Sequence, residues 1–68
     1  MIDTDELRGF IVKRGLSQAK IAKKIGITPK TFYEKMNRGV FGTDEIEIIM
    51  SELAMNPEEA IAIFFSTR

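Results

Sequence analysis

The side chains of Lys30, Thr31 and Glu34 have the types and the spacing to recognise the edges of base pairs. A lysine donates to guanine O6 and N7, a carboxylate accepts from cytosine N4, and a threonine contacts a thymine methyl or donates to a phosphate. If Phe32 and Met36 face the interior of a helix, an advance of about 100° per residue turns Lys30 and Glu34 outward. Thr31 then lies at one edge of the outward face. The pattern predicts contacts between these three side chains and DNA bases.

The same outward face has a second interpretation, which requires no ligand. Lys30, Glu34 and Arg38 follow one another at intervals of four residues. Opposite charges at this spacing form surface ion pairs, which stabilise a helix by about 0.2–0.5 kcal/mol each. The sequence leaves open whether Glu34 discriminates between bases or only belongs to such a ladder.

Two short amphipathic helices with a tight turn between them are predicted to position this face. Apolar residues within 17–25 recur at spacings of one, three and four, which is typical of one buried helix face. Gly26 is expected to end the first helix, because glycine adopts left-handed backbone at little cost. Thr28 and Pro29 are expected to start the second helix, as its N-cap and its first residue. This second helix is predicted to continue to about Arg38.

The segment 17–36, SQAKIAKKIGITPKTFYEKM, resembles the helix-turn-helix of the Cro/repressor family of phage and bacterial regulators. The residues that carry the resemblance are Gln18, Ile21, Ala22, Ile25, Gly26, Ile27 and Phe32. The sequence departs from the family at Lys35, because the family usually has an apolar residue three positions after Phe32. Here the apolar residue comes one position later, at Met36. The resemblance implies a compact all-α domain of the lambda repressor type, whose second helix enters the major groove of DNA.

The resemblance also implies which residues read bases. In the family, these are the first, second and sixth residues of the second helix, here Pro29, Lys30 and Glu34. Pro29 has no side-chain donor, so it can offer only an apolar contact. From their positions near helix starts and on polar faces, we also predict contacts with the DNA backbone for Gln18, Lys20, Lys24, Thr28, Arg38 and Thr43.

The rest of the sequence predicts three further helices and no strand, within a single domain of residues 1–68. One helix is expected from about Thr4 to Arg14, and another from a cap at Thr43. A third is expected after the start signal in residues 56–59, which combines a cap, a first-position proline and a capping-box glutamate. The first two of these helices should turn apolar residues toward a small core, namely Leu7, Phe10, Ile11, Ile46, Ile49, Met50 and Leu53.

The second half of the chain carries more apolar residues than the core of so small a domain requires. Contiguous exposed apolar patches usually mark interfaces, where Met and Phe are favoured. We therefore expect a homodimer interface formed by Val40, Phe41, Ile48, Met55, Ile63 and Phe65. The alternative for each of these residues is that it closes the core of the domain.

The charges are unevenly distributed, although ten basic and ten acidic residues give a formal net charge of zero. Residues 8–40 contain nine basic side chains and one acid, whereas residues 42–68 contain six acids and one basic side chain, Arg68. Charges further apart than about 8–10 Å are screened, so a phosphate backbone responds to the nearby basic half. This predicts salt-sensitive DNA binding that depends on basic side chains such as Lys24 and Arg38.

The composition argues against other classes of function. The chain has no Cys and no His, which excludes a disulfide and a thiolate or imidazole metal site. We find no nucleophile–base pair and no phosphate-binding glycine loop, so no catalytic site, cofactor or small-molecule ligand is expected. No apolar run is long enough to span a membrane, and the acidic N-terminus is unlike a signal peptide. A location in the bacterial cytoplasm or nucleoid is expected.

Taken together, these patterns predict a transcriptional regulator, similar to phage Cro and repressor proteins, that occupies its operator as a homodimer. The alternative is an interaction adaptor with the same fold, of the antirepressor or antitoxin type, whose apolar C-terminal half binds another protein. The basic side chains within residues 18–38 favour DNA binding, because such an adaptor does not need them.

Overall fold

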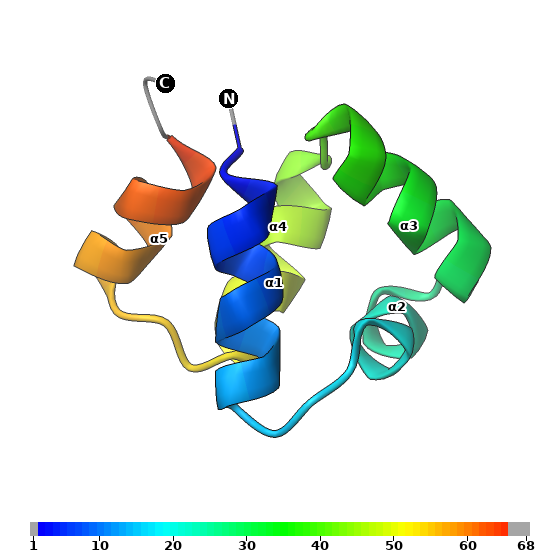
Figure 1. Ribbon diagram of the computed structural model, residues 1–68, viewed down its shortest axis with the longest axis horizontal. Coiled ribbons are helices and arrows are strands. Elements are labelled where there is room, and N and C mark those ends of the chain that lie inside the picture. The colour runs from blue at the N-terminus through cyan, green and yellow to red at the C-terminus, as the bar shows by residue number, and fades with distance from the viewer. Residues whose placement is uncertain (1, 66–68) are drawn as a thin grey trace.

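The computed structural model describes residues 2–65, and within this range it contains five α-helices and no β-strand (Figure 1). The helices are α1 (Thr4–Lys13), α2 (Gln18–Ile25), α3 (Pro29–Arg38), α4 (Thr43–Glu52) and α5 (Pro57–Phe64). This confirms the predicted all-α class and the number and order of the helices.

Four of the five helices follow an N-cap residue whose side chain accepts a hydrogen bond from the backbone N–H three residues later. These N-cap residues are Asp3, Ser17, Thr28 and Asn56. At α5 the contact is reciprocal, because the Asn56 N–H also donates to Glu59 Oε1 at 2.9 Å. Such caps satisfy backbone donors that a helix start would otherwise leave without a partner, and each contributes about 1 kcal/mol. The sequence therefore sets these helix starts locally.

The start of α4 differs from the prediction. Thr43 is the first residue of the helix and not its cap, which is Gly42. The cause is Glu45, whose Oε1 accepts a hydrogen bond from the Gly42 N–H at 2.7 Å. This is one half of a capping box, and it fixes the helix start one residue earlier than the Thr43 hydroxyl would have done.

Glycines in left-handed conformation end α2 and α3, as predicted for Gly26, and α3 ends at Arg38, where the sequence placed its end. Gly26 has a φ of 94° and donates its N–H to the Ala22 carbonyl, while Gly39 has a φ of 69° and donates to the Lys35 carbonyl. Residues other than glycine rarely adopt this backbone conformation. Only residues 26–28 separate the two helices, so the turn between them is tight.

Buried apolar residues from all five helices and the flanking segments form one core. Its members are Ile2, Leu7, Ile11, Ile21, Ala22, Phe32, Met36, Phe41, Ile49, Leu53, Ala60, Ile63 and Phe64. The rings of Phe32 and Phe41 pack at a centroid distance of 5.3 Å and an angle of 52°. Partly buried Phe10, Ile46 and Met50 pack against this cluster, so the predicted inward faces of the first and fourth helices are confirmed.

The predicted exposure of Phe41 and Ile63 is wrong, because both are buried in the core. Phe41 packs on Phe32, and Ile63 lies one turn along α5 from buried Ala60. Of the other residues assigned to the dimer interface, Ile48 and Met55 are half-buried. Val40 and Phe65 are exposed, by 63% and 68%. Ile61 is exposed as well, although it was not among the residues predicted to be so.

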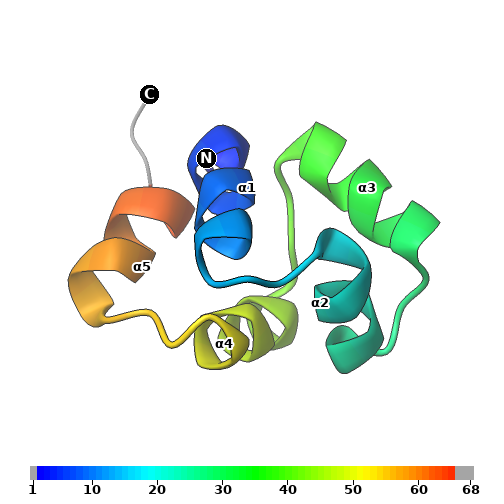
Figure 2. The same ribbon diagram turned by 60° about the horizontal axis from the view of Figure 1, so that its bottom comes forward.

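The helices are arranged so that α3 and α5 lie at opposite ends of the longest axis, with α1 and α4 between them (Figures 1 and 2). The axes of the molecule measure 28, 23 and 20 Å. α2 packs against both α3 and α4, and α1 packs against α5. A backbone hydrogen bond of 2.8 Å from Asp3 N to the Ile63 carbonyl joins the start of α1 to α5. The α2–α3 pair therefore occupies one end of the molecule.

Candidate nucleic-acid interface

Close packing of α2 on α3 determines which face of α3 is left free. Ile21 and Ala22 of α2 are buried, as are Phe32 and Met36 of α3. The small side chain of Ala22 is fully buried, and its carbonyl accepts hydrogen bonds from Gly26 and from the following residue of the turn. A small residue at this position lets the two helices approach closely. The opposite face of α3 is consequently turned to solvent.

The outward face of α3 carries Lys30 and Glu34, as the sequence predicted, and it also includes Tyr33. Its exposed members are Lys30, Tyr33, Glu34, Asn37 and Arg38. Thr31 is half-buried at the edge of this face, and its hydroxyl accepts a hydrogen bond of 3.0 Å from the Thr28 hydroxyl. The Thr28 oxygen in turn accepts the Thr31 backbone N–H. The Thr28 hydroxyl thus donates one hydrogen bond and accepts one within the helix cap, whereas Thr31 keeps its own hydroxyl hydrogen for another partner.

The ladder of surface ion pairs that was the alternative for α3 is not observed. Within residues 2–65, ion pairs join Arg8 to Asp5, Arg14 to Glu59, and Lys35 to Glu45. None of them involves Lys30, Glu34 or Arg38. These three charged groups are therefore free to contact a ligand.

Lys35, where the sequence departs from the family pattern, forms an ion pair within the fold. Its Nζ donates to Glu45 Oε1 at 3.1 Å, and the same oxygen accepts the Gly42 N–H. The Glu45 side chain is only 13% exposed and the Lys35 side chain 32%. The contact ties α3 to the start of α4. Sequence reasoning missed this pair, and its only signal was a glutamate at the third position of α4.

The basic side chains of residues 8–40 divide into two groups. Arg8, Arg14 and Lys35 are held in ion pairs. The others have no ion-pair partner within residues 2–65 and are exposed: Lys13, Lys20, Lys23, Lys24, Lys30 and Arg38. Five of these six are on α2 and α3, where Glu34 is the only acid. The uneven charge distribution of the sequence therefore becomes a positive surface around the α2–α3 pair.

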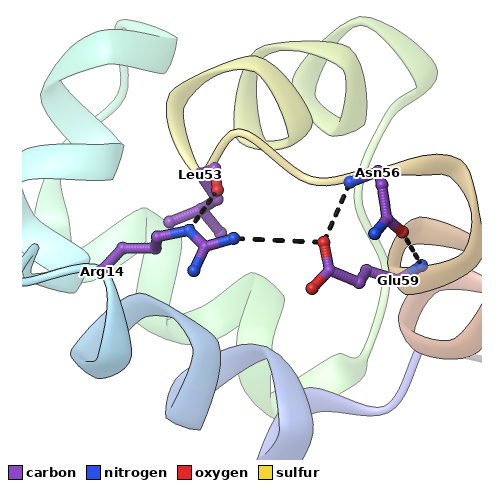
Figure 3. Close-up of polar contacts among 4 residues, drawn as sticks. All are labelled: Arg14, Leu53, Asn56 and Glu59. Atoms are coloured by element: carbon purple, nitrogen blue, oxygen red, sulfur yellow. Dashed lines mark hydrogen bonds and ion pairs between the residues drawn. The ribbon is translucent and has the colours of Figure 1, made fainter.

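Arg14 makes structural contacts (Figure 3), although the sequence identified it only as the end of the first predicted helix and as one of the nine basic residues of 8–40. Its Nε donates to the Leu53 carbonyl at 2.8 Å, and Nη2 lies 4.0 Å from Glu59 Oε1. Its guanidinium also lies over the Phe10 ring, 4.4 Å from the centroid. Arg14 thereby joins the end of α1 to the segment between α4 and α5, and it is unavailable for a ligand.

The residues predicted to contact the DNA backbone are dispersed over the molecule. Half-buried Gln18 is the first residue of α2, Arg38 is the last of α3, and Thr43 is the exposed first residue of α4. Lys20 and Lys24 line a pocket that α2 forms with the end of α4 and to which no α3 residue contributes. The structure thus brings the predicted base-reading residues together on α3, but not all of the predicted backbone contacts.

Residues 2–65 contain neither a candidate metal-binding cluster nor a candidate membrane-spanning helix. No cluster of three or more acidic side chains in this range can hold a metal ion. No helix there is sufficiently long and apolar to span a membrane. Comparisons of the chain with family models, with curated proteins and with solved structures find no match. The candidate interface on α3 consequently stands on its own geometry and charge.

Proposed function

We propose that this chain binds duplex DNA by placing α3 in the major groove, with α2 lying across the backbone. The observation that carries the proposal is the outward face of α3, where Lys30, Glu34 and Arg38 are exposed and have no ion-pair partner in the described chain. A charged face on a well-packed helix, supported from behind by a second helix, matches how a helix-turn-helix presents its second helix.

The dimensions of α3 suit the groove. An α-helix with its side chains is about 10–12 Å in diameter. The major groove is also about 12 Å wide. With Lys30 and Glu34 at the base edges, Arg38 reaches a phosphate at the far side of the groove. Lys30 donates to guanine, Glu34 accepts from cytosine N4, and Thr31 contacts a thymine methyl or a phosphate.

Backbone contacts are proposed at two helix ends. Gln18 is the first residue of α2, where free N–H groups and the helix dipole favour a phosphate. Arg38 is at the end of α3 and carries the charge that such a contact requires. Lys20, Lys24, Thr28 and Thr43 stay predictions, with Thr28 limited by the use of its hydroxyl in the cap.

In this proposal the protein acts as a homodimer, which occupies an operator and regulates transcription in the bacterial cytoplasm or nucleoid. One α3 contacts only a few base pairs, so selectivity requires two copies on half-sites about 34 Å apart. Exposed Val40 and Phe65, with half-buried Ile48 and Met55, provide the apolar surface for pairing. α3 and α5 lie at opposite ends of the 28 Å axis, so end-to-end pairing at α5 would separate the two α3 helices by more than about 34 Å, and half-sites at this spacing require the two copies to pair side by side or at an angle.

Selection of bound sites from a pool of random duplexes tests the proposal. We expect enrichment of a two-fold symmetric consensus, with half-site centres about one helical turn apart. Sedimentation of the complex should show two copies per site. Absence of any enriched sequence would contradict DNA recognition, and one copy per saturated site would contradict the dimer alone.

The alternative is an adaptor that binds another protein through its exposed apolar side chains. The observation in its favour is that Val40, Ile61 and Phe65 are all more than half exposed. An adaptor of this kind would enrich no sequence in the selection.

A further inference from the structure

A pocket open to solvent lies between α2 and the C-terminal end of α4. Its volume is about 420 Å³, and its lining residues are Leu16, Lys20, Ile21, Lys23, Lys24 and Glu52. Figure 2 shows α4 and α3 on different sides of α2, with the α1–α2 connection passing close to α2. None of the lining residues belongs to α3. The pocket is therefore separate from the outward face of α3.

The pocket combines an apolar floor with a charged rim. Its apolar lining residues, here called the floor, are half-buried Leu16 and almost fully buried Ile21, and its charged lining residues are here called the rim; both floor residues pack in or against the core, which holds them in place. Three lysines from α2 form most of the rim. Neither these lysines nor Glu52 takes part in an ion pair within residues 2–65. The site thus combines apolar lining residues with ammonium groups that have no ion-pair partner within residues 2–65.

We infer that this pocket binds an acidic peptide segment of a partner protein, with one aliphatic side chain on the floor and flanking carboxylates at the lysines. The volume is within the range of about 300–1,000 Å³ that is usual for ligand pockets. Burial of a leucine side chain provides the apolar contribution to binding, and complementary charge fixes the orientation of the segment. The inference does not depend on DNA binding by α3, and it assigns Lys20 and Lys24 to the peptide in place of their predicted contacts with the DNA backbone.

The same charges are less suited to the phosphates of DNA. A phosphate backbone has no apolar group to place on Leu16 and Ile21, and it has no hydrogen-bond donor for the Glu52 carboxylate. A peptide can use both features, because its backbone N–H groups can donate to Glu52. An acidic peptide with an aliphatic anchor therefore fits the observed surface better than DNA does.

The experiment is a titration of the isotope-labelled protein, followed by amide NMR shifts. The probe is the capped hexapeptide Glu-Asp-Glu-Leu-Glu-Asp, and the matched control peptide has Ser in place of Leu. We expect saturable shifts centred on Leu16, Ile21 and Glu52. The control peptide should bind at least about tenfold more weakly, because it lacks the buried leucine.

Two charge reversals of the protein complete the test. The variant Lys24→Glu, at the rim, should weaken binding of the leucine peptide by about tenfold. Lys13→Glu changes the net charge equally on an exposed residue of α1 outside the pocket, and it should leave the affinity within about twofold. Equal affinity for both peptides, an equal effect of both variants, or no saturable shift would overturn the inference. The inference would also be overturned if a random-sequence DNA duplex displaced the leucine peptide from the wild-type protein and did not bind the Lys24→Glu variant.

Discussion

At the scale of single residues, the charged side chains of α3 fall into two environments. Lys30, Glu34 and Arg38 are exposed and have no ion-pair partner in the described chain. Lys35 is half-buried and paired with Glu45. This difference separates side chains that can contact a ligand from one that positions the helix carrying them.

Replacing Glu34 with alanine should reduce discrimination between bases while preserving or raising affinity for non-operator DNA. The reason is that a carboxylate near phosphates costs electrostatic energy and is useful only where it selects a partner. Competition binding on duplexes varied one base pair at a time measures both quantities. Glu47→Ala on the exposed face of α4 is the control. Unchanged base preference in Glu34→Ala would mean that this carboxylate does not read DNA.

Replacing Glu45 with glutamine should isolate the ion pair with Lys35 from the cap of α4. The amide oxygen can still accept the Gly42 N–H, but the charge opposite Lys35 is lost. We expect a decrease of about 1 kcal/mol in the free energy of unfolding, since both partners are partly buried. Urea denaturation measures it, with exposed Glu47→Gln as the control. Equal stability of the two variants would show that the pair does not secure α3.

At the scale of elements, local signals determine most helix boundaries. The caps at Ser17, Thr28 and Asn56 and the glycines at 26 and 39 each act within four residues, so the sequence alone located these ends. The start of α4 was misplaced because two local signals compete there. The Glu45 carboxylate, and not the Thr43 hydroxyl, provides the cap.

Two glycine substitutions should have opposite effects on stability. Gly26 has a φ of 94° and Gly9 is within helix α1, and a Cβ at either position would meet no atom within 4 Å. Gly26→Ala should therefore cost only backbone strain, about 1 kcal/mol, which lowers Tm by about 4–8 °C. Gly9→Ala should raise stability by about 0.5–1 kcal/mol. Thermal melts measure both, and a neutral Gly26→Ala would contradict the observed turn.

The face of α5 and the environment of Lys35 could not be predicted from local pattern. Residues 60–65 are all apolar, so periodicity could not show that Ile63 is buried and Ile61 exposed. Packing of α5 against α1 makes that choice. The pairing of Lys35 with Glu45 likewise depends on the approach of α3 to α4. For the candidate site, the outward residues of α3 could be predicted from the sequence, because Phe32 and Met36 define the buried face of the helix. The pocket at α2 could not be predicted, because it forms only where α2 meets α4 in the tertiary structure.

At the scale of the whole molecule, the unpaired cations concentrate at one end. Lys30 and Arg38 are on α3 at this end, and α5 with its acidic first turn is at the other. Screening limits the electrostatic interaction of each charge to a range of about 8–10 Å. The zero net charge of the chain therefore does not oppose binding of a polyanion at the α2–α3 end. Of the exposed large apolar side chains, Tyr33 lies on α3, whereas Val12, Val40, Ile61 and Phe65 lie outside it.

DNA affinity should decrease with salt, and removal of a phosphate contact should flatten this dependence. Arg38→Ala is expected to reduce the slope of log affinity against log salt by about 0.9, the value for one lost contact. Lys13→Ala, an exposed residue on α1, should leave the slope unchanged. Titrations of a fixed duplex at several salt concentrations give the slope. Equal slopes for wild type and Arg38→Ala would remove the proposed phosphate contact of Arg38.

The most direct test of the proposed DNA recognition is site selection performed in parallel with wild type and Lys30→Ala. Lys30 is exposed on the outward face of α3 and has no ion-pair partner in the described chain. Wild type should enrich a two-fold symmetric consensus containing guanine at the position that Lys30 contacts. Lys30→Ala should enrich the same consensus with that one position relaxed in each half-site. Identical consensus sequences, or none from wild type, would contradict recognition of DNA through this face.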